Sequence, residues 1–207
     1  MRKLFITTSL LLACMVGVFA QNMQFGVRVG ANISSVSFNE NVDGIKSKTG
    51  LQAGITLDVQ INENVYLLTG LDVAQKGTKL SGSDDGVSLT ITGNPLYVIV
   101  PVHVGYKMGL TGATLMPHAG LYFAYGLSGK LNAKGTSDGV SASVDAGDYF
   151  EDGLFKPVDL GLGIGATLEI GKLNFNLGYD LGLANIADEA DVTAKNGSVF
   201  LTVGYKF

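Results

Sequence analysis

The sequence lacks the residue types on which thiol chemistry and a densely charged surface depend. Its 207 residues include one cysteine, four prolines and no tryptophan. Only 15% are charged, against about 25% in an ordinary soluble domain. The chain is instead rich in glycine, with 29 residues, and in apolar residue types, which make up 46%. Low charge, abundant glycine and short apolar runs indicate an all-β protein that meets an apolar medium.

A long apolar run is also missing after the first twenty residues, so no transmembrane helix is predicted there. The first twenty residues are different. Two basic residues precede an apolar stretch over 4–18, and Ala20 ends a small-x-small cleavage pattern. This arrangement predicts a signal peptide over residues 1–20 and an outer-membrane β-barrel domain over residues 21–207.

The single cysteine offers an alternative to this cleavage. Leu11-Leu12-Ala13-Cys14 faintly resembles a lipoprotein box, in which Cys14 would be lipidated. The apolar run continues past Cys14 to Phe19, which favours cleavage after Ala20. The mature chain then has no cysteine, which excludes disulfides and thiol chemistry. The signal takes two of the 14 basic residues and none of the 18 acidic ones, so the mature net charge is −6, which argues against nucleic acid as a partner.

Strict alternation of apolar and polar residues recurs along the rest of the chain. In residues 51–61, for example, leucine, alanine, isoleucine and valine alternate with glutamine, glycine, threonine and aspartate. Eight segments of about ten residues share this pattern, each long enough to cross a bilayer at a tilt. They are 25–34, 51–61, 65–75, 96–106, 115–127, 159–170, 173–183 and 198–207. The sequence therefore predicts an eight-stranded antiparallel up-and-down transmembrane β-barrel.

The predicted connections alternate in length. Short turns are expected at 62–64, 108–112 and 171–172, and long polar loops at 35–49, 77–94, 129–158 and 185–196. Short periplasmic turns and long external loops are typical of an outer-membrane barrel.

Alternation alone does not say which face meets solvent, because a secreted lipocalin-like barrel would carry its apolar face inside. The polar face here consists mostly of Gly, Asn, Thr, Gln and Tyr with few charges, which favours an interior. Aromatic residues near the strand ends suit interfacial girdles: Phe25, Tyr106, Phe123, Tyr125, Tyr179, Tyr205 and Phe207. The last strand ends on Phe207, and such an ending resembles the signal read by the outer-membrane assembly machinery.

Several short motifs, in order along nearly the whole mature chain, resemble the PorT-like outer-membrane β-barrel family. They are Gly70-Leu71, Gln75-Lys76-Gly77, Tyr97-Val98-Ile99-Val100-Pro101, Ala119-Gly120, Asp159-Leu160-Gly161 with Gly163 and Gly165, Tyr179, Gly182-Leu183 and Asn185-Ile186. The chain departs from the family at Ile99 or Val100, where members often carry a charge. The resemblance implies the fold and an outer-membrane location. It also implies a role as an accessory of a secretion apparatus, since the family's namesake serves one.

Ionisable residues on the polar face are the candidate functional groups, as a lumen polar network: Arg28, Asp58, Asp72, His103, His118, Asp159, Glu169, Asp180 and Lys206. A proton or ion path is one interpretation, and a plug of ion pairs in a narrow barrel is the favoured one. The two histidines lie on consecutive strands, and a register with one opposite the other is possible. Hydrogen-bonded imidazoles are favoured over a metal or pH-sensing site, because no third ligand is evident.

No nucleophile with a base and no nucleotide fingerprint is found, so the sequence predicts no enzyme, cofactor or metal. The predicted function is an interaction or structural role through external loops around a plugged lumen. The alternative is a small pore or a carrier of a lipid or hydrophobic ligand. Expected partners are outer-membrane lipids, the assembly machinery and a protein bound at the loops. In the third loop, four acidic residues predict a solvated surface rather than a calcium site: Asp145, Asp148, Glu151 and Asp152.

Overall fold

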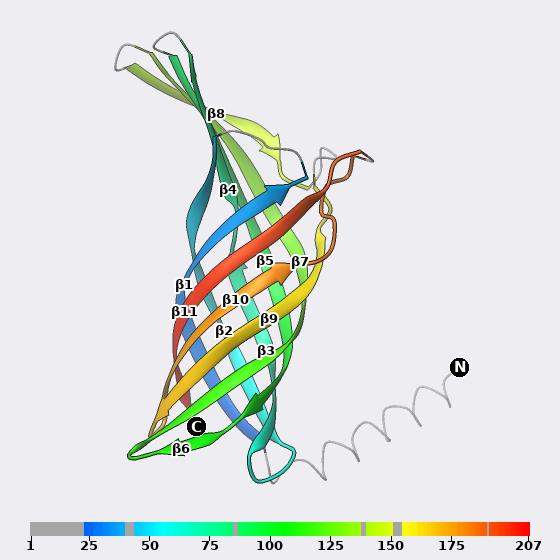
Figure 1. Ribbon diagram of the computed structural model, residues 1–207. Coiled ribbons are helices and arrows are strands. Elements are labelled where there is room, and N and C mark those ends of the chain that lie inside the picture. Colours follow the sequence, from blue (N-terminus) through cyan, green and yellow to red (C-terminus); the bar gives the residue numbers. More distant parts are fainter. Residues whose placement is uncertain (1–22, 40–43, 85–86, 138–139, 151–154, 190) are drawn as a thin grey trace, which may run out of the picture.

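The computed structural model describes residues 23–39, 44–84, 87–137, 140–150, 155–189 and 191–207 (Figure 1). The predicted signal peptide and its cleavage site lie outside the described residues. The described chain forms eleven strand segments: β1 Met23–Phe38, β2 Ile45–Gln60, β3 Val65–Gln75, β4 Thr78–Asp84, β5 Val87–Tyr106, β6 Met108–Leu110, β7 Ala113–Ser137, β8 Val140–Asp148, β9 Val158–Ile170, β10 Leu173–Gly182 and β11 Ala194–Lys206. Among these residues, no helix is long and apolar enough to cross a membrane.

The strands close into an eight-stranded barrel, in which β3 and β4 together count as one strand. Around the barrel the order is β1, β2, β3 continued by β4, β5, β7, β9, β10 and β11, each antiparallel to its neighbours. The first and last strands close it, in a register that runs from Gly26 opposite Lys206 to Phe38 opposite Ala194. Closure lets the backbone groups of every barrel strand pair with a neighbouring strand, as a hydrocarbon environment requires. The predicted eight-stranded antiparallel barrel is therefore confirmed.

The alternation sorts the side chains as a membrane barrel requires. Apolar residues point outward and are exposed: Leu51 by 71%, Val29 and Ile164 by 62% each. Polar residues of the other parity point inward and are buried, as in Asn32 and Asp72, each 1% exposed. Transferring such an apolar exterior to water is unfavourable, whereas in hydrocarbon it costs nothing. This arrangement excludes the lipocalin-like alternative, whose apolar face would point inward.

The seven predicted girdle aromatics all lie on the exposed outer surface, in two bands. Phe25, Tyr106, Tyr205 and Phe207 lie near the end of the barrel that holds the C-terminus, here called the terminal end (Figure 1). Phe123, Tyr125 and Tyr179 lie toward the opposite end, here called the hairpin end because the β4–β5 and β7–β8 hairpins project from it.

Two of the predicted polar loops are largely strands. The region 77–94 contains β4 and the start of β5, and the region 129–158 contains the end of β7 and all of β8. Together these segments pair as a four-stranded antiparallel sheet that continues beyond the barrel, here called the extension. The prediction of loops was wrong because serine, threonine and glycine suggested turns, whereas long-range pairing stabilises strands. The other two loops are shortened, since β1 reaches Phe38, β2 starts at Ile45 and β11 starts at Ala194.

The extension has one apolar and one polar face. The apolar face contains the row Leu80, Ile91, Ala133 and Val144, the row Gly82, Leu89, Gly135 and Ala142, and then Val140. The polar face contains the rows Lys79, Thr92, Asn132 and Asp145; Ser81, Thr90, Lys134 and Ser143; and Ser83, Ser88, Thr136 and Ser141. Ile91 and Ala133 share the parity of the buried, inward Gly93 and Leu131. The apolar face of the extension therefore continues the inner surface of the barrel, the reverse of the polarity within the membrane.

Candidate functional site in the barrel interior

The structure places all nine predicted lumen residues on the inner surface. Asp58, Asp72, His103, His118, Asp159, Asp180 and Lys206 are buried, and the side chains of Arg28 and Glu169 are 12% and 11% exposed. They come from all eight strands of the barrel, so alternation supplies the orientation and the barrel brings them together.

Arg28 on β1 and Asp72 on β3 meet across a glycine of the strand between them. Gly54 of β2 is opposite Arg28 on one side and opposite Asp72 on the other. Arg28 Nε donates to Asp72 Oδ1 at 2.7 Å, and a second guanidinium nitrogen donates to Oδ2. A Cβ at Gly54 would lie 2.2 Å from Asp72 Oδ1, so the missing side chain makes this bidentate pair possible.

A second group of charges lies toward the terminal end. Lys206 Nζ donates to both Asp58 and Glu169, and Lys107 Nζ is 3.1 Å from the other oxygen of Glu169. Two cations and two carboxylates thus form one compensated network, as buried charges require.

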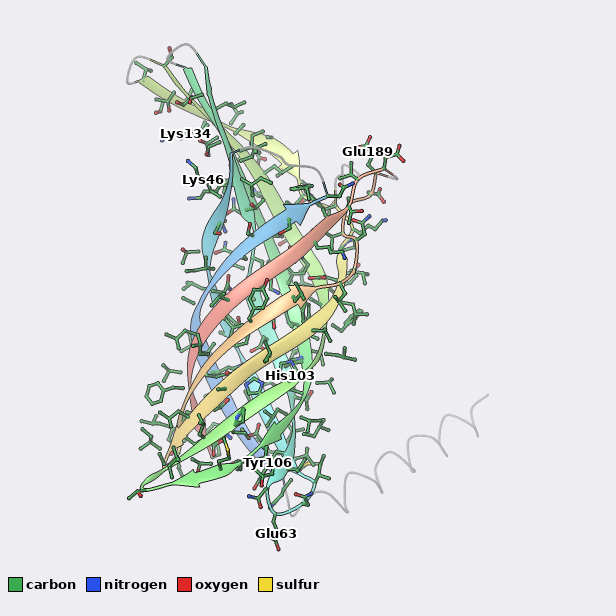
Figure 2. All side chains as sticks on the ribbon, viewed as in Figure 1. Lys46, Glu63, His103, Tyr106, Lys134 and Glu189 are labelled. Carbon is green, nitrogen blue, oxygen red and sulfur yellow. The ribbon has the colours of Figure 1, made fainter. Side chains whose placement is uncertain are left out.

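The two histidines contact each other diagonally rather than face each other across the strands. His103 is opposite Gly120 and His118 is opposite Gly105, so the register that would place one histidine opposite the other is not observed. Their Nδ1 atoms are nevertheless 3.0 Å apart and the rings are stacked with centroids 5.1 Å apart. Figure 2 shows His103 within the barrel wall, well below the hairpin end.

If both rings are neutral, their hydrogen bonds select one tautomer of each ring. His118 Nε2 is 3.2 Å from the Asn176 side-chain oxygen, which only accepts, so Nε2 carries the proton. His118 Nδ1 then accepts from His103 Nδ1. This leaves His103 Nε2 as a buried acceptor without a hydrogen-bond partner among the described residues. Among the residues that the structure describes, no three His, Cys, Asp or Glu residues form a group that could hold a metal ion.

A third group of polar residues lies nearer the hairpin end. Lys76 Nζ is 3.5 Å from Asp180 Oδ2 and 4.9 Å from the centre of the Tyr122 ring. The Tyr122 hydroxyl and the Asn196 amide both donate to Asp159 Oδ2, at 3.1 and 2.9 Å. Neutral donors therefore hold one buried carboxylate and a lysine holds the other.

Between these groups lies a cavity of about 50 Å³, lined by charged side chains such as Arg28 and Asp180 and by apolar ones such as Leu68, Ile99 and Phe200. Since a water needs roughly 10–15 Å³ measured in this way, the cavity has room for a few waters. His103 is one of the lining residues, so a water in the cavity is a candidate donor to its unpartnered Nε2.

Aromatic residues of the β8–β9 connection enter the barrel at the hairpin end. Tyr149 lies over Gly93 and Gly129, where an added Cβ would lie 2.7 and 2.5 Å from its atoms. Phe150 lies over Gly126, where a Cβ would lie 2.1 Å from its Cζ. The three glycines thus form a socket for two aromatic side chains, and Tyr149 is 1% exposed.

Two apolar clusters extend from this socket. Phe150 contacts Tyr97 edge to face at 5.7 Å, in a cluster with Ala74, Ile99, Tyr122 and Ala124. Tyr149 stacks on Phe155 with ring centroids 4.4 Å apart, and Phe155 also packs on a cluster of Val36, Ile186, Ala187 and Ala194. Burial in these surroundings raises the pKa of the Tyr149 hydroxyl well above its usual range, with a further contribution from nearby Tyr97 and Asp159.

The sequence matches a family model described as outer membrane protein beta-barrel domain over residues 19–188, which is most of the chain. The chain belongs to this family. Membership agrees with the closed barrel and its apolar exterior, and it indicates an outer-membrane location. No curated protein matches the chain.

Solved structures of small outer-membrane proteins are similar to this one. Neisserial surface protein A is 13% identical, with 88% of this chain and 97% of that chain covered and a TM-score of 0.41. Ail, the attachment invasion locus protein of Yersinia pestis, is 17% identical, with coverages of 90% and 99% and a TM-score of 0.40. OprG of Pseudomonas aeruginosa is 14% identical, with coverages of 90% and 96% and a TM-score of 0.36. The family assignment rests on the family match and not on these structures.

Several interior residues of this family member were not among the predicted site residues: Lys76, Lys107, Tyr122, Asn176 and Asn196. The alternation could have identified three of them. Lys76, Tyr122 and Asn176 lie an even number of residues from inward-pointing neighbours, so the pattern predicts that they also point inward. Asn196 fell in a predicted loop. Of the acidic residues assigned to the third loop, Asp145 and Asp148 lie on β8, and the other two lie outside the described residues.

Proposed function

We propose that this chain is a non-enzymatic outer-membrane barrel with a plugged lumen, which presents the extension to a protein partner outside the cell. The observation that carries the proposal is the filled interior. Three groups of paired polar side chains span the barrel, and the cavity between them has only about 50 Å³. A barrel of eight strands encloses little more than its own side chains.

The size of that cavity argues against a carrier of hydrophobic ligands, because about 50 Å³ is far below the roughly 300–1,000 Å³ of an ordinary ligand pocket. A pore would need a continuous wet path, whereas Tyr149 and Phe150 fill the barrel at the hairpin end. The histidines, the natural general bases, are hydrogen-bonded to each other and to Asn176, an arrangement that activates no nucleophile.

Export and assembly complete the proposal. Residues 1–20 act as the signal peptide, and the C-terminal strand ending in Phe207 is read by the assembly machinery. Phe207 suits this role because its side chain is 68% exposed on the outer surface while its backbone N–H donates to Phe25 at 2.9 Å. The resemblance to the PorT-like family adds a candidate for the partner, a component of a secretion apparatus.

The test is single-channel recording of the purified chain in planar bilayers. The plugged barrel is expected to give no conductance steps while remaining folded by its heat-modifiable mobility on gels. The informative companion is a variant with Tyr149→Ala and Phe150→Ala, which empties the glycine socket and leaves the charged groups in place. Silence from both proteins locates the plug in the charged interior, and steps from the variant alone locate it in the socket. Stable steps from the natural chain would make transport the leading function.

A further inference from the structure

The apolar face of the extension is a contiguous exposed surface outside the membrane barrel. Val140 is 74% exposed, Val144 63% and Leu89 51%, and all three belong to the same face. Gly82 and Gly135, on either side of Leu89, have open space where a Cβ would be. Isolated exposed apolar residues are ordinary, but a contiguous patch rimmed by polar residues marks a binding surface.

Strand β8 adds a second, independent feature, a free edge. Among the described residues β8 pairs only with β7, so its other side presents unpaired backbone groups over nine residues. Natural edges are usually blunted by lysine, proline, an inward charge or a short strand. The outer part of this edge, residues 140–144, reads Val-Ser-Ala-Ser-Val and contains neither charge nor proline, and the two aspartates of β8 lie nearer the barrel, at positions 145 and 148. An edge of this kind is a template for a further strand.

We propose that β8 binds an extended, uncharged segment of a partner polypeptide as an added strand. Main-chain hydrogen bonds to β8 supply affinity. Every second side chain of the segment is apolar and packs beside Val140, Ala142 and Val144, on the apolar face of the extension. This inference deepens the interaction role proposed above and names the class of partner at that surface. Small Ala142 and open Gly135 leave room for a large side chain of the segment to reach back over the face.

The size of the face favours a strand over a globular partner. Four strands at ordinary spacing and about seven residues of length cover roughly 450 Å². One partner in a standard protein interface contributes about 800 Å². The face alone is therefore too small for a stable interface between two folded surfaces. A bound strand gains hydrogen bonds along the edge in addition to apolar contact.

Symmetry argues against a neighbouring copy in the same membrane. Two such copies are related by a two-fold axis along the membrane normal, which places equivalent strands at twice their tilt. If β8 keeps the tilt of about 35–45° that is typical of barrel strands, the two β8 strands would cross at about 70–90° and form no ladder. Only copies in opposing membranes escape this restriction.

The test uses the full mature chain in lipid nanodiscs and a fluorescent nine-residue peptide of alternating threonine and valine with both ends capped. Two controls are the same peptide in a non-alternating order and the peptide N-methylated at every second residue. The protein variants are Val144→Lys and Ser143→Lys, which add the same charge at adjacent positions of β8 but on opposite faces. Gel mobility of both variants checks that they are folded.

Saturable binding of the alternating peptide, absent with both control peptides, is expected. Val144→Lys is expected to weaken it at least tenfold, and Ser143→Lys by less than threefold. No saturable binding to the natural chain overturns the inference, and so does an equal loss in both variants. Clustering of proteoliposomes without peptide, abolished by Val144→Lys, would assign the surface to a second copy instead. A silent barrel that fails to bind the peptide refutes this inference and leaves the plugged-barrel proposal standing.

Discussion

Replacing Arg28 with methionine removes the guanidinium that donates two hydrogen bonds to Asp72, whose side chain is 1% exposed. The carboxylate then stays buried without its partner. Breaking a buried ion pair from one side costs about 3–5 kcal/mol, because an uncompensated charge remains. We therefore expect the free energy of unfolding to fall by about 3–5 kcal/mol in Arg28→Met.

The opposite substitution should be milder. Asp58 and Asp180 also attract the Arg28 guanidinium, so Asp72→Asn leaves the cation with two remaining carboxylates nearby. Replacing both partners, with Arg28→Met and Asp72→Leu together, leaves no unpaired charge at this pair. Since an apolar pair often equals a buried ion pair, the double variant should recover most of the loss.

The assay is urea unfolding in micelles, followed by circular dichroism because the chain has no tryptophan. The matched control is Lys130→Met, which breaks an ion pair with Asp145 whose side chains are 75% and 59% exposed. This control should change stability little, because exposed pairs are screened by water and salt. The reasoning is refuted if Arg28→Met costs no more than Lys130→Met, or if the double variant loses the sum of the two single losses.

Three further predictions concern the interior and the glycine socket. Gly126→Ala places a Cβ 2.1 Å from Phe150 Cζ and should cost about 1–3 kcal/mol by urea unfolding, whereas Gly135→Ala, in open space, should be neutral. Lys206→Met leaves Asp58 without its cation, while Glu169 keeps Lys107, and should lower the free energy of unfolding by about 3–5 kcal/mol in the same assay. The raised pKa of Tyr149 means that above pH 10.0, its ordinary value, only the unfolded state ionises this group, so stability falls as pH rises. Tyr149→Phe should therefore lose less stability between pH 7 and pH 11 than the natural chain, and an equal loss would contradict this assignment.

Most of the barrel could be predicted because its strands obey one local rule. In β2 the alternation from Leu51 onward sets both the strand and the direction of each side chain, since a pleated strand turns successive residues to opposite faces. Composition then decided which face meets lipid, because the polar parity was too poor in charge for a water-facing surface. No knowledge of the partner strands was needed for either step.

The pairing inside the barrel could not be predicted in the same way. Parity shows that Arg28 and Asp72 both point inward, but only the registers of β1, β2 and β3 place Gly54 between them. The histidines show the same limit, because they meet on a diagonal that depends on the β5–β7 register. Register depends on long-range pairing, which a single sequence specifies only through its turns and its pattern.

The position at which the apolar residues change from odd to even numbers indicates where the membrane ends, and this change can be read from the sequence. Along β5, apolar residues occupy odd positions at Leu89 and Ile91 and even positions from Leu96 onward. The strand continues through this change, so the chain does not turn; the medium around it changes. Outward positions meet hydrocarbon on the Leu96 side, whereas on the Ile91 side they are Thr92 and Thr90, which suit the polar layer outside. Beyond the membrane, the apolar residues lie on the face that we assign to a partner strand. One change in the alternation therefore accounts for both the membrane boundary and the binding surface.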